Sequence, residues 1–416
     1  MTGRREFLKT GAGAAAALAT LASVRQRFLD DLAAASPGLP DRSAYLLDPQ
    51  VRYLNHGSIG TIPRLVHEAH VRYLRVCETN PWLYMWSEPW VEPIEEVRRR
   101  ASSLMGVGAE DMVLTHNTTE AFNLLAHGLP LGPGDEVLYS SLNHPGASNP
   151  WTHMAPVRGF SVREFQFPVE ETPGLSPDDV VALHIREIRP ETRVLVFPHV
   201  DNLVGLRHPM AALARAARRA GVEVIAVDGA QTLSMIPVDL GGTEVDVYAG
   251  SPHKWVQAPK GLGVAYLRGT LQERLHPMWV SSGQPAARGS VRRFEDYGTR
   301  NRPEVLTLGS ALAFQERMGP ATKEAAHRRH WQEIRERVEA TPELRWHSPT
   351  DWGMAAALYT VEVRGRSAFQ VADELWDRHR ITVRPIRIHG TEGLRLSPNH
   401  HTDPAEVEAF FRAVGA

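Results

Sequence analysis

Seven short apolar runs, several of them rich in valine, recur through the middle of this 416-residue chain, and helical patterns such as residues 211–220 lie between several of them. Strands that alternate with helices need crossover connections, and such connections favour a largely parallel sheet. The runs cover residues 111–117, 135–141, 162–167, 194–200, 222–228, 245–251 and 261–267. The pattern therefore predicts an α/β fold in which a mainly parallel, seven-stranded sheet forms a large domain.

The rest of the chain is arranged around this sheet. We assign residues 1–35 to a leader, 36–108 to an N-terminal segment that joins a small and a large domain, 109–303 to the large domain and 304–416 to a C-terminal small domain. A long helical pattern runs from Pro303 to about Val338, and strand and helix patterns follow at residues 357–363, 367–380, 381–385, 394–397 and 404–414. This mixture predicts a smaller α+β domain.

The first residues have the pattern of an export signal. A twin-arginine motif, RREFLK, occupies residues 4–9, and an alanine-rich, weakly apolar run follows at residues 11–24. This run is shorter than the roughly 20 apolar residues of a membrane span. We interpret the segment as a signal for the twin-arginine (Tat) translocation machinery, with small-residue cleavage sites at residues 17–19 and 33–35; the alternative is an amphipathic first helix. We therefore expect a periplasmic or secreted protein with no membrane span in the mature chain.

Composition narrows the possible chemistry. The formal net charge of −2 gives no basic surplus for binding nucleic acid. Cys77 is the only cysteine, which excludes an intramolecular disulfide and a cysteine-built metal cluster. The pair His400-His401 indicates a surface loop rather than a metal site, and His67 and His70 lack a metalloprotease pattern, so we predict no metal.

A buried lysine, unlike an arginine, can lose its proton near neutral pH. The four lysines are Lys9, Lys254, Lys260 and Lys323.

Polar side chains gather where the predicted strands end. In an open α/β sheet, ligands bind beyond the carboxyl ends of the strands. Those ends are followed by residues 116–120 (HNTTE), 143–146 (NHPG), 199–202 (HVDN), 228–231 (DGAQ) and 250–255 (GSPHKW). We therefore expect one rim of the sheet to hold a carboxylate, a lysine, hydroxyls, histidines and amides.

Pyridoxal 5′-phosphate (PLP) is a cofactor that needs this set of groups. A lysine amine bonds to its aldehyde, and a carboxylate pairs with its pyridine nitrogen and keeps that nitrogen protonated. A helix N-terminus with hydroxyls and free N–H groups holds its phosphate. Residues 117–120 suit the phosphate because threonine also caps helices. The sequence therefore predicts pyridoxal phosphate as the cofactor.

The order of these motifs resembles the class V aminotransferase superfamily, whose members have the PLP-dependent transferase fold type I. The resemblance runs from about Tyr53 to the C-terminus and includes the sequence Pro259-Lys260-Gly261 after the lysine motif. Residues 53–58 (YLNHGS) and 298–301 (GTRN) resemble the branch around isopenicillin N epimerase. The resemblance implies a homodimer with a shared active site and a small-molecule substrate that carries an amino group.

The same resemblance assigns roles to residues around the cofactor. It implies that Lys254 bonds to the aldehyde, with Lys260 as the rival, and that Asp228 pairs with the pyridinium nitrogen. His144 would stack on the ring as a third catalytic residue. The residues expected to hydrogen-bond the ring hydroxyl are Asn202 and Gln231. The residues expected to hold the phosphate are Thr118, Thr119, Ser251 and His253.

Further residues are implied at the subunit interface and around the substrate. Thr299 would reach a phosphate across the dimer interface, and Arg300 and Arg395 would approach the substrate carboxylate. Asn55 and His56 would line the substrate pocket. A nearby aromatic group either lines the pocket or belongs to the core or an interface; it consists of Trp82, Tyr84, Trp86 and Trp90.

One absence limits the reaction. Cysteine desulfurases of this superfamily need a cysteine nucleophile, and residues 381–395, where it would lie, contain none. Cys77 lies far upstream in a helical pattern, where a buried apolar cysteine is expected. We therefore predict an enzyme, not a cysteine desulfurase, that acts at the amino-bearing carbon of an amino acid or a peptide side chain. Epimerisation, amino transfer and elimination by a C–S or other β-lyase stay open. A non-catalytic binding protein on the same fold is the alternative from another class.

Overall fold

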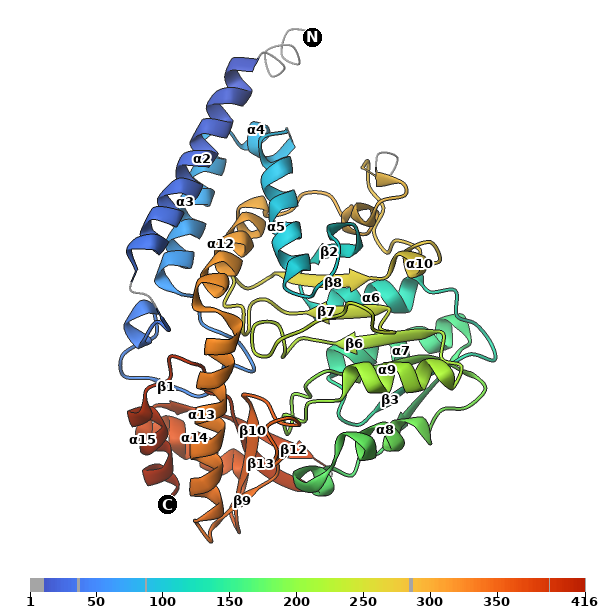
Figure 1. Ribbon diagram of the computed structural model, residues 1–416, viewed down its shortest axis with the longest axis vertical. Helices are drawn as coiled ribbons and strands as arrows, with labels where there is room; N and C mark the ends of the chain where they lie inside the picture. The colour runs from blue at the N-terminus through green and yellow to red at the C-terminus, as the bar shows by residue number, and fades with distance from the viewer. Residues whose placement is uncertain (1–10, 36–37, 87, 284–286, 389, 416) are drawn as a thin grey trace.

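The computed structural model describes residues 11–35, 38–86, 88–283, 287–388 and 390–415. The twin-arginine motif at residues 4–9 lies outside the described residues. Two sheets organise the chain, a large one in its middle and a small one near its C-terminus, and helices pack around both (Figure 1).

The large sheet contains all seven strands that the apolar runs predict. Its order is β2-β8-β7-β6-β5-β3-β4, and β8 runs antiparallel to both its neighbours while the other pairs are parallel. The strands are β2 Met112–Thr115, β3 Glu136–Ser140, β4 Ser161–Phe165, β5 Thr192–Pro198, β6 Val224–Asp228, β7 Val247–Gly250 and β8 Gly263–Leu267. The prediction of a mainly parallel seven-stranded sheet is confirmed.

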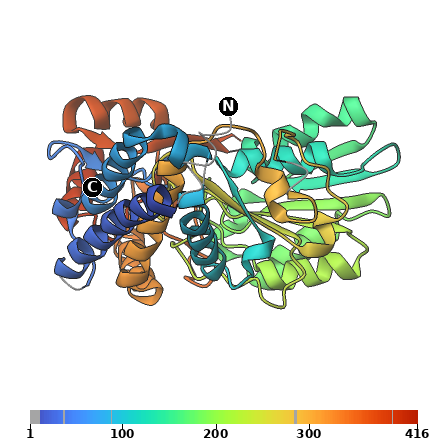
Figure 2. The ribbon, with the colours of Figure 1, turned by 90° about the horizontal axis from the view of Figure 1, so that it is seen from above.

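The strands of this sheet are apolar along their whole length because both faces are covered. In β5, Val194 and Val196 face one layer and Leu195 and Phe197 face the other. Helices α6 (Thr118–Gly128) and α7 (Pro145–Arg158) pack on the first face. Helices α8 (Pro177–Ile185) and α9 (Met210–Arg219) pack on the second, so the sheet lies between two helical layers (Figure 2).

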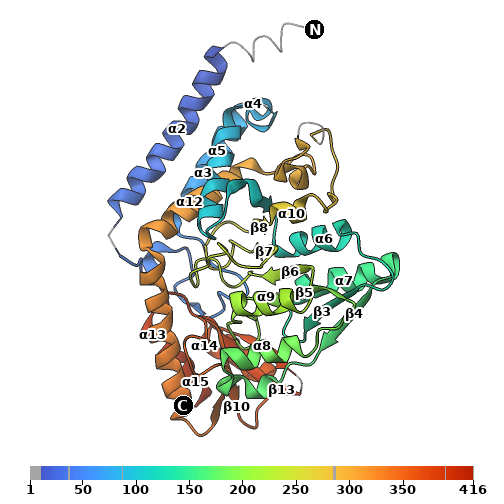
Figure 3. The same cartoon turned by 45° about the vertical axis from the view of Figure 1, so that its right-hand side comes forward.

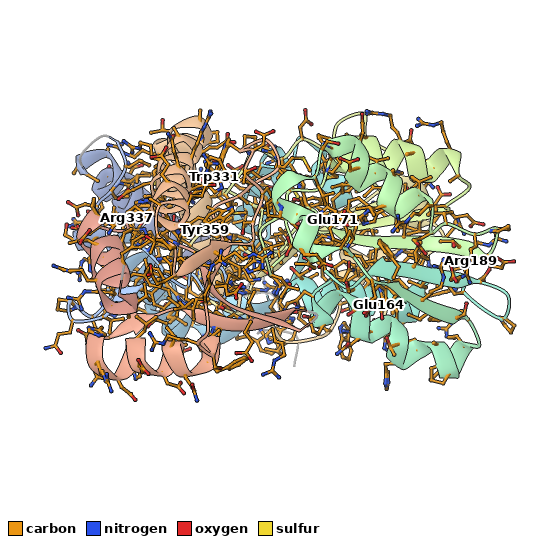
Figure 4. The ribbon with its side chains drawn as sticks, turned by 90° about the horizontal axis from the view of Figure 1, so that it is seen from below. Glu164, Glu171, Arg189, Trp331, Arg337 and Tyr359 are labelled. Atoms are coloured by element: carbon orange, nitrogen blue, oxygen red, sulfur yellow. The ribbon has the colours of Figure 1, made fainter. Side chains whose placement is uncertain are left out.

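The small sheet is antiparallel, with the order β12-β13-β10-β9. Its strands are β9 Leu344–Trp346, β10 Tyr359–Val363, β12 Arg384–Ile388 and β13 Thr391–Leu396. Helices α13 (Pro320–Glu339), α14 (Ala368–His379) and α15 (Pro404–Val414) accompany it. Their shared core includes Trp331 and Tyr359, which Figure 4 shows in the opposite half of the molecule from Glu164 and Arg189.

The long helical pattern after Pro303 is two helices rather than one. Helix α12 (Arg302–Met318) ends at Gly319, whose φ of 78° is a conformation that favours glycine, and α13 begins at the following proline. The strand expected at residues 381–385 is likewise divided, into β11 (Ile381–Thr382) and β12.

The N-terminal segment connects the two sheets. Strand β1 (Arg52–Tyr53) pairs in parallel with β11. Helices α3 (Arg64–Thr79) and α5 (Val91–Ser103) lie beside α12, and α4 (Pro81–Trp86) contacts α3 (Figure 1). The remaining short helices are α10 at Gly269–Gln272 and the 3₁₀ turns at Arg42–Ala44, Glu88–Trp90, Ala109–Asp111, Val169–Gly174 and Val291–Glu295.

Helix α2 (Gly11–Ala34) covers most of the predicted leader and lies along the outside of α3 (Figure 3). Its spacing of buried residues follows one helical face: Ala17, Leu21, Val24, Phe28 and Leu32. Arg72 of α3 lies 3.4 Å from Asp31 of α2 and adds an ion pair to this contact. Within the described ranges, no helix is long and apolar enough to cross a membrane.

The turn after β5 gives a test of how tightly the two sheets are joined. Gly205 has a φ of +72°, and a Cβ added there would lie 1.9 Å from the backbone oxygen of Leu358, just before β10. We expect Gly205→Ala to lower the free energy of unfolding by at least about 3 kcal/mol, because it adds a clash to backbone strain. Gly242→Ala is the control, since Gly242 has a φ of +69° with nothing within 4 Å, and should lose only about 1–2 kcal/mol. Equal losses in guanidinium unfolding would contradict this account of the turn.

Candidate active site

A cavity of about 290 Å³ lies beyond the carboxyl ends of the parallel strands. Nine of the ten residues expected to bind the cofactor line it: Thr118, Thr119, His144, Asn202, Asp228, Gln231, Ser251, His253 and Lys254. They come from the ends of five different strands, so the topology of the sheet is what brings them together. Lys260, the rival lysine, is exposed and does not line the cavity.

A carboxylate and an amine both line the cavity. Asp228 is the last residue of β6, and its Oδ1 accepts a hydrogen bond from the N–H of Ala230 at 2.9 Å. Burial lowers the pKa of Lys254 to about 8, against the opposing effect of the Asp228 carboxylate. Within the described ranges, the Lys254 amine has no hydrogen-bond or ion-pair partner. About one-tenth of such amines are unprotonated at pH 7, so Lys254 is available to bond with an aldehyde.

The start of α6 forms an end of the cavity that suits an anion. Asn117 caps the helix by accepting the N–H of Glu120 at 2.9 Å, and Thr118 and Thr119 are the first helical residues. The hydroxyls of Thr118 and Ser251 lie 2.7 Å apart. Free N–H groups, a helix dipole and three hydroxyls therefore converge where a phosphate would be held.

The two histidines of the cavity are neutral at pH 7. His144 precedes α7, and its Nδ1 accepts the N–H of Gly146 at 3.0 Å, which leaves the proton of the neutral ring on Nε2. Burial lowers the pKa of His144, while the charge of Asp228 works in the opposite direction. Burial and, to a lesser degree, the charge of Lys254 lower the pKa of His253 to about 4.

Trp255 fixes the orientation of the Gln231 amide. The indole N–H of Trp255 donates to Oε1 of Gln231 at 2.9 Å, and Nε2 of Gln231 donates to the backbone oxygen of Gly57 at 2.8 Å. Because Oε1 is occupied by an N–H donor, the amide cannot flip without breaking both bonds. The second N–H of Gln231 stays available as a donor, which suits a ring oxygen.

A loop from the N-terminal segment closes the cavity. The N–H of Gly60 donates to the backbone oxygen of His253 at 3.0 Å, and a Cβ at Gly60 would lie 1.9 Å from the backbone oxygen of Lys254. Gly57 and Ser58 line the cavity itself. The loop therefore packs directly on the turn that carries the lysine.

Arg395 lies behind this loop. Its guanidinium is fully buried and donates to the backbone oxygen of Asn202 at 2.8 Å, to Oδ1 of Asn55 at 3.0 Å and to Oγ of Ser58 at 2.6 Å. Neither Asn55 nor Arg395 is among the residues that line the cavity. Both adjoin it through Asn202 and Ser58, which do line it.

Three other expected site residues lie elsewhere. His56 is fully buried between the rings of Tyr53 and His401, with ring centroids 4.8 Å and 4.9 Å away, and does not line the cavity. Thr299 and Arg300 line a second cavity of about 390 Å³. The guanidinium of Arg300 donates to the backbone oxygens of Leu114 and Thr115 at 2.6 Å and 2.9 Å, because those carbonyls of β2 need donors at the sheet edge.

The aromatic group divides between core and surface. Tyr84 and Trp90 are buried and pack against each other with ring centroids 5.0 Å apart, whereas Trp82 and Trp86 are exposed. Trp86 lines the second cavity together with Thr299. His400 and His401 are buried rather than in a surface loop, and their rings lie in a cluster with Tyr45.

Sequence reasoning gave no role to Arg384 or to Trp255. Arg384 lines the cavity, but its place depends on the register of β12 against β13, which the apolar pattern does not give. Trp255 lies within the motif GSPHKW, directly after the lysine, so the signal for it was present. Its role depends on the contact with Gln231, which no spacing in the sequence reveals.

The Trp255–Gln231 bond can be tested through cofactor affinity. We expect Trp255→Phe to weaken the binding of added pyridoxal phosphate about 5- to 10-fold, because the buried Oε1 of Gln231 loses its donor. Trp331→Phe is the matched control, since the buried Trp331 indole N–H has no partner among the described residues. Affinities are measured by absorbance titration of protein depleted of cofactor. Equal affinity in the two variants would show that the bond does not orient Gln231.

Comparisons with known proteins agree on one family. The family model described as aminotransferase class-V matches residues 52–409. The isopenicillin N epimerase of Streptomyces clavuligerus is 30% identical over 391 residues, which covers 90% of this chain and 97% of that protein. The isopenicillin N epimerase of Amycolatopsis lactamdurans is 31% identical over 389 residues, covering 90% and 96%. A cysteine desulfurase of Klebsiella pneumoniae is 30% identical over 285 residues, covering 64% and 67%.

Solved structures show the same fold. The C-DES mutant with glycine covalently linked to its PLP cofactor aligns with a TM-score of 0.80 at 22% identity, over 91% of this chain and 100% of that one. The cysteine desulfurase of Thermococcus onnurineus aligns with a TM-score of 0.77 at 23% identity, over 91% and 98%. The fold is therefore PLP-dependent fold type I, and the cofactor is pyridoxal 5′-phosphate. The chain belongs to the class V aminotransferase family.

Proposed function

We propose that this PLP enzyme acts at the amino-bearing carbon of an amino acid or of a peptide side chain, by epimerisation or amino transfer. The observation that carries the proposal is that one cavity holds the Lys254 amine, the Asp228 carboxylate and the start of α6, which Asn117 caps. Binding alone would not require an unpaired lysine whose pKa is lowered to about 8 beside a fixed carboxylate.

Each end of the cofactor has a matching group in the cavity. When bound, pyridoxal phosphate supplies an aldehyde and a ring that accepts electrons from the substrate carbon. Asp228 provides the negative charge that favours a protonated ring nitrogen, and neutral His144 provides a flat surface for stacking. The second N–H of Gln231 supplies a donor for the ring oxygen.

Lys254 has two tasks in this proposal. Its amine would hold the cofactor through the aldehyde, and once freed the same amine would lie next to the Cα proton of the substrate. With a pKa of about 8, the freed amine can take that proton and return it near neutral pH. Arg395, held by Asn55, Ser58 and Asn202, adjoins the cavity and would pair with the substrate α-carboxylate.

The alignments with the two isopenicillin N epimerases each cover 90% of this chain. This similarity supports epimerisation or amino transfer over the β-lyase alternative. A desulfurase mechanism has no support in the residues, because Cys77 is the only cysteine and lies buried in α3, where burial raises the pKa of its thiol. We therefore propose that the enzyme is not a cysteine desulfurase.

We also propose that the chain is exported and works as a homodimer. The twin-arginine motif at residues 4–9 supports export to the periplasm or beyond. Thr299 and the exposed Trp86 line a second cavity. This exposed apolar residue supports a dimer surface there, across which Thr299 would reach the phosphate bound by the other subunit. Light scattering of the holoenzyme tests the dimer, and cell fractionation of a variant in which both Arg4 and Arg5 are lysine tests the route of export.

Proton exchange at Cα tests the catalytic role of Lys254. In D₂O, the holoenzyme should exchange the Cα proton of its substrate, followed by NMR over a panel of D- and L-amino acids. Lys254→Ala should lower the exchange rate about 10²- to 10⁴-fold, because the group that moves the proton is lost. Lys260→Ala should leave it unchanged, since Lys260 is exposed outside the cavity. Bound cofactor without exchange for any amino acid would favour the non-catalytic binding protein.

The lowered pKa of Lys254 predicts a pH dependence for cofactor loading. Only the unprotonated amine bonds to the aldehyde, so the rate at which the visible absorbance band forms should rise with pH and level off above about pH 8 to 9. An ordinary lysine would give a rate that still rises at pH 10. Such a continued rise in stopped-flow mixing of cofactor-depleted protein with pyridoxal phosphate would contradict a buried amine.

A further inference from the structure

Two arginines face each other across neighbouring strands of the small sheet. Arg384 is the first residue of β12, and its register partner on β13 is Arg395. Residues directly opposite in an antiparallel pair present their side chains on the same face, where two like charges destabilise the sheet. Burial lowers the pKa of Arg395 to about 9, and Arg384 is the neighbouring charge that lowers it most. The sheet thus keeps a repulsive pair beside the active site.

The two guanidinium groups differ in their partners. Arg395 uses three hydrogen bonds to the loop at residues 55–58 and to Asn202. Among the residues that the structure describes, Arg384 has no hydrogen-bond or ion-pair partner. Arg387, on the same strand, pairs with Glu392, so the strand can supply a partner to an arginine. Of these two arginines of β12, the one that lines the cavity is thus the one without a partner among the described residues.

The charges around the cavity leave Arg384 without a counter-charge. Asp228 is the only carboxylate among the described residues that line it, and the proposed function assigns this group to the cofactor ring nitrogen. The phosphate is assigned to the start of α6, and the α-carboxylate of the substrate to Arg395. The positive charge of Arg384 also lowers the pKa values of Lys254 and His144, after the larger effect of burial, which places it near the reacting groups.

We propose that Arg384 binds a second anionic group, a carboxylate carried by the side chain of the substrate. This inference rests on the proposed function and narrows its substrate class to amino acids with an acidic side chain. One carboxylate on each arginine converts the repulsion between Arg384 and Arg395 into two charge-assisted pairs. A neutral side chain would leave Arg384 unpaired when the substrate excludes water from the cavity, which is unfavourable.

Binding of a matched pair of amino acids to the holoenzyme tests the proposal. Both enantiomers of glutamate and of glutamine are titrated, and the change in the cofactor absorbance band gives each dissociation constant. Wild type should bind glutamate about 10- to 100-fold tighter than glutamine, because a carboxylate pairs with a guanidinium more strongly than an amide does. Arg384→Gln should remove this preference by weakening glutamate about 10- to 100-fold, with less than about 3-fold effect on glutamine. Arg384→Lys should keep part of it.

Arg387→Gln is the matched control, because Arg387 lies on the same strand but on its opposite face, is exposed, pairs with Glu392 and does not line the cavity. It should change neither dissociation constant. An unaltered cofactor band and circular dichroism spectrum establish that each variant is folded. An equal loss for glutamate and glutamine in Arg384→Gln would overturn the proposal, since it would place Arg384 on the α-carboxylate. Equal binding of the two amino acids by wild type would overturn it as well.

A second measurement separates this inference from the proposed function. Glutarate and butyrate lack an amine, so their calorimetric binding to the holoenzyme does not depend on any reaction at Lys254. The diacid should bind wild type more tightly than the monoacid, and Arg384→Gln should abolish the difference. If glutarate shows this preference but no amino acid perturbs the cofactor band, the proposed function fails while the anion site at Arg384 stands. If amino acids bind without an acidic preference, the inference alone fails.

Discussion

The site depends on two parallel strands that end side by side. Asp228 of β6 lies in register with Ala249 of β7, and the N–H of Gly229 donates to the oxygen of Ala249 at 2.7 Å. This pairing sets where the chain leaves each strand, so the carboxylate at one end and the lysine five residues beyond Ala249 reach the same cavity. The lowered pKa of Lys254 follows from this placement, because the effect of burial on the amine outweighs the opposing charge of Asp228.

The second requirement is that the cofactor pocket and the small sheet share one loop. Gly57 accepts a hydrogen bond from Gln231, and Ser58 accepts one from Arg395. Asn55 bridges to Ser397 at the end of β13. The groups assigned to the cofactor and the group assigned to the substrate are therefore positioned by the same few residues. Trp255 adds to this arrangement by fixing Gln231 from the side of the lysine turn.

Much of the large domain was predictable because buried parallel strands are apolar along their whole length. The same rule predicted which residues line the cavity, since polar groups after such strands converge on one edge. The short strands outside the large sheet were harder: β1 has two residues and β9 has three, which is too short for a periodic pattern. Arg384 and Arg300 could not be placed from sequence, because one depends on strand register and the other on carbonyls of β2 that are distant in the chain.

The close approach at Gly60 has a mechanical consequence. The loop at residues 55–60 is hydrogen-bonded to the lysine turn at one end and to the small sheet at the other. Only a hydrogen atom of Gly60 separates the loop from the carbonyl of Lys254. Neither the loop nor the lysine turn can therefore move toward the other without a clash. A rigid-body movement of the small sheet would therefore displace Arg395 and the amine of Lys254 together, so that the opening of the cavity and the alignment of the groups around it would change in concert.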